Sequence, residues 1–148
     1  NRAASDVAGE IASLLTLANH MGDRDAIVIF PEGTRSNSAK RARRLAELSQ
    51  RNPQRAERLA NLRFLLPPKP SGAVALLEAL PNASVVVCAH TGFDGMDSFT
   101  GMLQSVSRGP VAVRFDLSCI ARPVGDPVEW LDSVWLELDG RVASLGGI

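Results

Sequence analysis

The sequence predicts an α/β fold, with a mixed sheet of about three or more strands flanked by helices. Three short apolar or alternating runs are typical of strands, at residues 27–30, 84–89 and 111–117. Around them, apolar residues recur at the three- and four-residue spacings of helices. A chain of 148 residues that is 45% hydrophobic and 22% charged can bury one core. We therefore expect one domain spanning residues 1–148.

The composition excludes several classes of protein. A net charge of zero and a pI near 6.9 argue against a nucleic-acid binder. Cys88 and Cys119 lie in apolar runs, so we expect small buried hydrophobes rather than a disulfide or metal pair. The sequence contains no cluster typical of a metal site, no apolar run of membrane-spanning length and no secretory signal. Since the chain begins at Asn1 rather than Met, we take it to be a fragment or a processed product.

The first two predicted elements lead to a polar turn. Residues 5–19 form an amphipathic pattern typical of a helix, with Ser5 or Asp6 as its cap. Residues 27–30 are β-branched or aromatic and predict a buried strand. Pro31 ends that strand because proline cannot donate to a sheet ladder.

The turn that follows has the residue types of an anion site. Gly33 permits close approach of a ligand or a positive φ, and Thr34 and Ser36 offer hydroxyls and are expected to cap the helix that follows. Arg35 offers a planar fork that matches a phosphate or a carboxylate. Because the carboxylate of Glu32 repels a phosphate, we expect it to orient Arg35 or to accept a hydrogen bond from a substrate hydroxyl.

The run Phe30-Pro31-Glu32-Gly33-Thr34-Arg35-Ser36 resembles the third conserved block of the glycerolipid acyltransferases, the family of 1-acyl-glycerol-3-phosphate acyltransferases. In that family the block binds the glycerol-phosphate acceptor, and its arginine faces the phosphate. The resemblance therefore implies four substrate-binding residues, Glu32, Gly33, Thr34 and Arg35.

The resemblance also implies an activity and its partners. The family transfers a fatty acyl group from acyl-CoA or acyl carrier protein to a lysophosphatidate-like acceptor in phospholipid synthesis, with no further cofactor. A histidine oriented by an aspartate activates the acceptor hydroxyl. The implied location is the cytoplasmic face of a membrane, as a peripheral protein. A non-catalytic module that binds phospholipid or a membrane surface is the alternative.

His20 and Asp25 have the spacing of the family's catalytic block, an Asn-His followed by four residues and an Asp. In the family that block lies well before the Pro-Glu-Gly-Thr-Arg block, whereas here the gap is a few residues. A strand between them would place His20 roughly 15 Å from Arg35, at about 3.3 Å per residue. We therefore interpret His20 as a helix C-terminal residue and Asp25 as a strand-entry residue. The catalytic pair is expected before Asn1, which makes this chain the C-terminal part of an acyltransferase domain.

Residues 40–63 are strongly basic and predict two helices, the second opened by Pro53. This segment is either a solvated face or a surface for anionic lipid headgroups or an acidic acyl carrier. The connector that follows, residues 65–72, is either a linker or an extension of the anion site through Lys69 and Gly72. A short helix is expected at residues 73–80.

The last third of the chain predicts two strands and two helices. Residues 84–89 are wholly apolar, which predicts a strand buried on both faces. His90 follows it, as a structural histidine or a substrate contact. Helices are expected at residues 98–106 and 127–145, and Asp126 caps the second. We expect the two tryptophans of that helix to pack on the sheet rather than at a membrane interface.

Overall fold

The computed structural model describes residues 2–93, 103–104, 107 and 109–146, and it confirms a mixed fold of helices and sheet. The helices are α1 (Arg2–Asn19), α2 (Ser38–Arg51), α3 (Pro53–Arg58), α4 (Pro70–Ala79) and α6 (Pro127–Gly146), and the strands are β1 (Val85–Thr91) and β2 (Arg114–Ile120). The strands pair antiparallel, from Val85 opposite Ile120 to Thr91 opposite Arg114. In the described part of the chain the sheet therefore has two strands.

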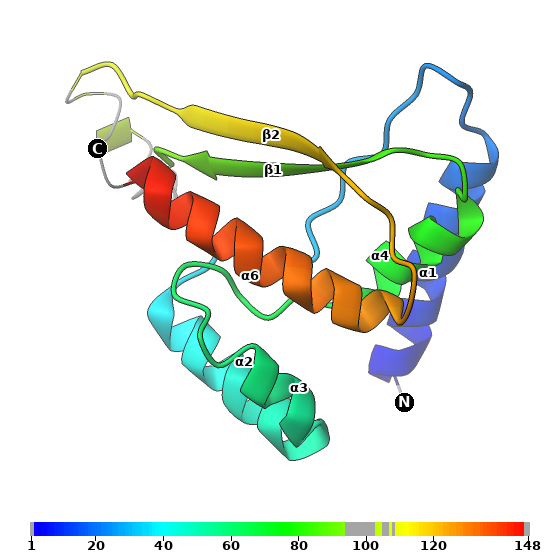
Figure 1. Ribbon diagram of the computed structural model, residues 1–148, viewed down its shortest axis with the longest axis horizontal. Coiled ribbons are helices and arrows are strands. Elements are labelled where there is room, and N and C mark those ends of the chain that lie inside the picture. The colour runs from blue at the N-terminus through cyan, green and yellow to red at the C-terminus, as the bar shows by residue number, and fades with distance from the viewer. Residues whose placement is uncertain (1, 94–102, 105–106, 108, 147–148) are drawn as a thin grey trace.

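Helix α6 is the centre of the arrangement (Figure 1). It packs along β1 and also touches β2, so it covers one face of the sheet. The pair α2 and α3 lies on the other side of α6, and α1 packs against α4 at one end of the molecule. The core lies between α6, the sheet and the segment that follows α3. Its buried members are Leu59, Leu62, Ala73, Ala89, Leu131, Trp135 and Leu138.

Some helix starts follow the predicted residues and others do not. Helix α1 begins at Arg2, so the predicted caps Ser5 and Asp6 lie inside it, and Asn37 rather than Thr34 or Ser36 caps α2. Asp126 Oδ1 accepts hydrogen bonds from the backbone N–H groups of Val128, at 2.7 Å, and Glu129, at 2.9 Å. These bonds satisfy donors that the first turn of α6 leaves without helical partners. Pro53 opens α3, as predicted, whereas α4 begins at Pro70 rather than at residue 73. Trp135 is buried in the core, which confirms the expected packing of that helix face.

The strand predicted at residues 27–30 is wrong. Residues 27–30 belong to no strand, since β1 and β2 pair with each other. Ile29 packs against the core, while Val28 is 76% exposed and Phe30 is 75% exposed. This apolar run therefore adds a side chain to the core without joining the sheet.

Burial on both faces of the sheet was also wrongly predicted, because α6 covers only one of them. On the other face, Val86 lies opposite Cys119, Cys88 opposite Leu117 and His90 opposite Phe115, and all six residues are exposed. Both cysteines are therefore free and exposed rather than buried. The helix predicted at residues 98–106 falls largely outside the described residues.

Candidate functional site

The predicted anion site is a turn between residues 27–30 and the start of α2. The N–H of Gly33 donates to the carbonyl of Phe30 at 2.8 Å and closes the turn. Gly33 has φ +66°, the left-handed conformation that the sequence allowed for there. Gly33, Thr34 and Arg35 are exposed, so an approaching anion can reach them from solvent.

Three cationic side chains surround this turn in addition to Arg35. Lys40 Nζ donates to Thr34 Oγ1 at 3.3 Å and to the Arg35 carbonyl at 3.2 Å. Arg44 Nη1 donates to the Glu32 carbonyl at 2.7 Å. A β-carbon placed on Gly33 would lie 3.4 Å from Lys69 Nζ, so that ammonium group lies directly over the glycine. We call Glu32–Arg35, together with Lys40, Arg44 and Lys69, the cationic turn.

Glu32 is the single carboxylate of the predicted site, and its environment disfavours ionisation. Burial raises the pKa of Glu32 from 4.5 to about 7, against the opposing effects of the Leu66 N–H bond and the Arg44 charge. Asp139 of α6 also raises this pKa, and Arg41 lowers it. Near neutral pH a large fraction of Glu32 is therefore uncharged, which reduces its repulsion of an anion in the turn.

The connector at residues 65–72 lies against the cationic turn through Lys69. The N–H of Lys69 donates to the Pro31 carbonyl at 2.8 Å, and Ser36 Oγ donates to the Phe64 carbonyl. One backbone bond to the connector and one side-chain bond to Phe64, the residue before it, therefore hold this part of the chain against the turn. Gly72 lies instead in α4, where a β-carbon would meet Leu14 of α1 at 3.3 Å.

His20 and Asp25 make local hydrogen bonds, within residues 16–25. His20 follows the last residue of α1, as predicted, and its Nδ1 bonds to the Thr16 carbonyl at 2.7 Å. Asp25 Oδ2 accepts from the Gly22 N–H at 2.8 Å and so closes a turn, rather than opening a strand. Both residues line an open hollow of about 450 Å³ together with four apolar residues, Leu17, Met21, Ala26 and Ile27.

His90 lies within β1 rather than after it, since the strand continues to Thr91. Its ring is exposed and meets Phe93 edge-on, with 5.2 Å between the ring centroids. Phe115 lies 6.2 Å away on the paired strand. Because the sheet is antiparallel here, the rule that ligands bind at the carboxyl ends of parallel strands gives no support for a substrate contact.

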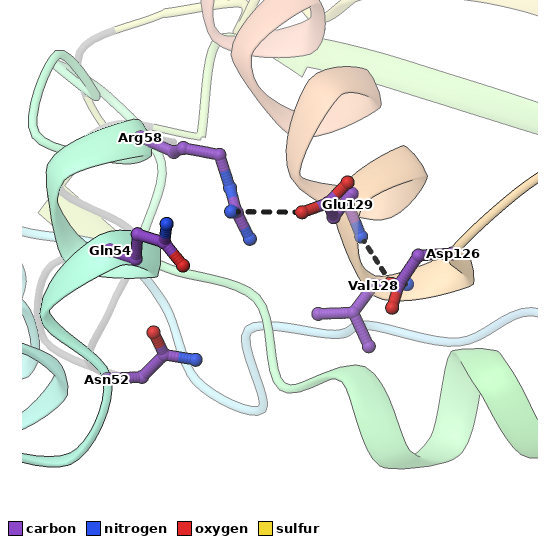
Figure 2. A pocket seen from close by; sticks show the side chains of 6 residues that line it. All are labelled: Asn52, Gln54, Arg58, Asp126, Val128 and Glu129. Atoms are coloured by element: carbon purple, nitrogen blue, oxygen red, sulfur yellow. Dashed lines mark hydrogen bonds and ion pairs between the residues drawn. The ribbon is translucent and has the colours of Figure 1, made fainter.

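A second hollow lies between α3 and the start of α6, and Figure 2 shows its six lining residues. Its volume is about 270 Å³, and its lining is Asn52, Gln54, Arg58, Asp126, Val128 and Glu129. Arg58 and Glu129 form an ion pair across it at 3.2 Å, and Asp126 is already engaged as the cap of α6. None of these residues belongs to the cationic turn, so this hollow adds nothing to the predicted site.

Sequence reasoning missed the individual roles of Lys40 and Arg44, which it treated only as part of a basic helical face. A signal was present, because residues four apart on a helix project from the same side. Both side chains bond to the turn that precedes α2.

Comparisons with known proteins identify no relative: no family model, no curated protein and no solved structure matches the chain. Within the described residues, no three histidine, cysteine, aspartate or glutamate side chains lie close enough to hold a metal ion. No helix in the same residues combines the length and apolar character needed to cross a bilayer.

Proposed function

We propose that this chain binds the phosphate of a lysophosphatidate-like acceptor as part of a glycerolipid acyltransferase. The observation that carries the proposal is the cationic turn, in which Lys40, Arg44 and Lys69 gather around Glu32–Arg35. A solvent-open glycine with a positive φ, flanked by a hydroxyl and a guanidinium, suits a tetrahedral dianion.

The proposed reaction transfers a fatty acyl group from acyl-CoA or acyl carrier protein to the free hydroxyl of the acceptor. In this proposal Arg35 holds the phosphate, Gly33 and Thr34 line its approach, and Glu32 orients the neighbouring groups. Holding the acceptor in place lowers the entropic barrier to attack on the thioester. The proposal includes a domain whose sheet has three or more strands and which acts as a peripheral protein at the cytoplasmic face of a membrane.

The proposal is tested by calorimetric titration of lysophosphatidate into the chain and into Arg35→Lys, below the concentration at which the lipid forms micelles. Replacing a bidentate fork with a point charge should weaken binding about tenfold, since a charge-assisted hydrogen bond contributes on the order of 1.5–3 kcal/mol.

Arg51→Lys is the matched control. It makes the same change at the end of α2, eleven residues beyond Lys40, or roughly 16 Å at about 1.5 Å per residue. Its affinity should equal that of the parent chain. Equal affinities for all three proteins would refute the assignment of Arg35.

A second candidate function, a non-catalytic module for anionic membrane surfaces, is favoured by α2. No residue of this helix is buried, and it carries five basic side chains, Lys40, Arg41, Arg43, Arg44 and Arg51. Such a module should bind vesicles that contain phosphatidate, and should release them as salt rises from 50 to about 300 mM, because surface attraction falls with the Debye length. Binding that depends on the vesicle surface but not on Arg35 would favour this second candidate.

A further inference from the structure

The segment at residues 63–66 lies between helix α6 and the cationic turn and forms hydrogen bonds with both. Asp139 of α6 is 3% exposed, so its carboxylate lies in the interior. Its oxygens accept three backbone N–H groups, those of Arg63 at 2.9 Å, Phe64 at 2.7 Å and Leu65 at 2.7 Å. Three backbone donors on one carboxylate fix both the side chain and the segment.

A second bond from α6 reaches the next residue of the same segment. Trp135 Nε1 donates to the Leu66 carbonyl at 2.9 Å, in the buried core. Trp135 and Asp139 lie four residues apart, on the same side of α6. Helix α6 therefore holds four consecutive residues of the segment by side-chain hydrogen bonds.

The far side of this segment contacts the turn itself. The Phe64 carbonyl accepts from Ser36 Oγ, and the Leu66 N–H bonds to the Glu32 carboxylate. Leu66 is thus held at its carbonyl by Trp135 and holds Glu32 with its N–H. Asp139 is therefore connected to Ser36 through Phe64. Trp135 is connected to Glu32 through Leu66.

We propose that Asp139 and Trp135 are positioning residues, which set the geometry of Glu32–Ser36 through the backbone of residues 63–66 without contacting a bound anion. Their role in acceptor binding rests on the proposed function of the turn. Glu32 faces the charges of Arg41 and Arg44 from α2 and of Asp139 from α6, while Lys69 lies over the neighbouring Gly33. Asp139 therefore acts on Glu32 through its charge as well as through the segment.

The first test follows the Glu32 carboxyl by carbon NMR between pH 5 and 9, in the absence of any ligand and with Glu32→Gln to assign the signal. In the parent chain the pKa of Glu32 should appear as a midpoint near 7. Asp139→Asn removes a negative charge that raises this pKa, so the midpoint should fall. General loosening of the fold would also lower the midpoint, because hydration of Glu32 removes the largest cause of its raised pKa, so the variant must keep the urea midpoint of the parent chain. An unchanged midpoint of the Glu32 titration in a folded Asp139→Asn chain would overturn the role of Asp139.

The second test compares the two tryptophans of α6. Trp135→Phe removes the donor to Leu66 and keeps an aromatic ring in the core. Trp130→Phe is the matched control, because Trp130 Nε1 donates to the Ala121 carbonyl at 3.1 Å instead. Amide signals of Glu32–Arg35 should move in Trp135→Phe and stay in place in Trp130→Phe. Equal movement in both variants, or none in Trp135→Phe, would overturn the positioning role of Trp135, even where Asp139→Asn fails to fold.

The third test measures the affinity of each chain for inorganic sulfate. Sulfate is the probe because its charge does not change between pH 5 and 9. Asp139→Asn and Trp135→Phe should each weaken sulfate binding about fivefold, the equivalent of roughly one net hydrogen bond, and Trp130→Phe should not. If the parent chain bound no sulfate, the proposed phosphate site would fail, while the carboxyl midpoint and the amide signals would still decide the positioning claim.

Discussion

Replacing Asp132 with Asn removes the buried charge that joins α6 to α3. Asp132 is 1% exposed, and its carboxylate accepts from Arg55 Nε, at 3.0 Å to each oxygen, and from Arg55 Nη2 at 2.8 Å. Arg58 Nη2 adds a longer bond of 3.3 Å. Arg55 is itself 7% exposed, so its guanidinium has little access to water as an alternative partner.

The expected loss in the free energy of unfolding is about 3 kcal/mol for Asp132→Asn, at the lower end of the range for breaking a buried ion pair, since Asn keeps one acceptor oxygen. That is a large fraction of the roughly 5–15 kcal/mol that typically holds a domain together. Urea denaturation followed by circular dichroism measures it. The control is Glu129→Gln, whose carboxylate pairs with Arg58 at 3.2 Å but is 64% exposed, and which should lose less than about 1 kcal/mol.

This pair also affects the candidate site, since Arg55 Nη2 donates to the Pro68 carbonyl at 2.8 Å, one residue before Lys69. Asp132→Asn should therefore loosen the connector as well as the helices. A loss in Asp132→Asn no larger than that in Glu129→Gln would refute the account of a buried, desolvated ion pair. An Asp132→Leu, Arg55→Met double variant that recovers most of the stability would support it, because no buried charge then lacks a partner.

Three further predictions concern the turn and the core. Because the pKa of Glu32 is about 7 in the folded chain and 4.5 ordinarily, stability should fall as pH rises from 5 to 8, by roughly 1–2 kcal/mol after allowing for partial exposure. Glu32→Gln should reduce this change in the free energy of unfolding, measured by urea titration. A parent chain that is equally stable at pH 5 and pH 8 would contradict the prediction. Gly33→Ala, at φ +66°, should lose about 1 kcal/mol and weaken sulfate binding, whereas Gly140→Ala on the open side of α6 should be neutral or stabilising. Leu59→Ala, at a side chain with 0% exposure, should lose about 3 kcal/mol by leaving a cavity, and a thermal midpoint within 2 °C of the parent would contradict that estimate.

Local rules predicted much of this chain correctly. The cap Asp126 and the first-turn proline Pro53 identified the starts of α6 and α3, because helix starts depend on residues next to each other in sequence. The turn at Gly33 was predicted for the same reason, and so was the position of His20 at the end of α1.

Long-range pairing explains most of the failures. Residues 27–30 have the composition of a strand, but a strand also needs a partner. Because β1 and β2 pair with each other, residues 27–30 have no strand beside them in the described part of the chain, and composition alone does not reveal that pairing. The cysteines were wrongly expected to be buried because the number of helices covering the sheet is a tertiary property. Asp139 was missed altogether, since its three backbone partners lie more than seventy positions earlier in the chain.

The most direct test of the phosphate site compares two lipids that differ only in that group. Amide signals of the nitrogen-labelled chain are followed during titration with lysophosphatidate and, separately, with a monoacylglycerol of the same acyl chain, both below micelle-forming concentrations. We expect the Gly33, Thr34 and Arg35 signals to move with lysophosphatidate and to stay in place with the monoacylglycerol. Equal movement with both lipids, or none with lysophosphatidate, would contradict a phosphate-binding role for the cationic turn.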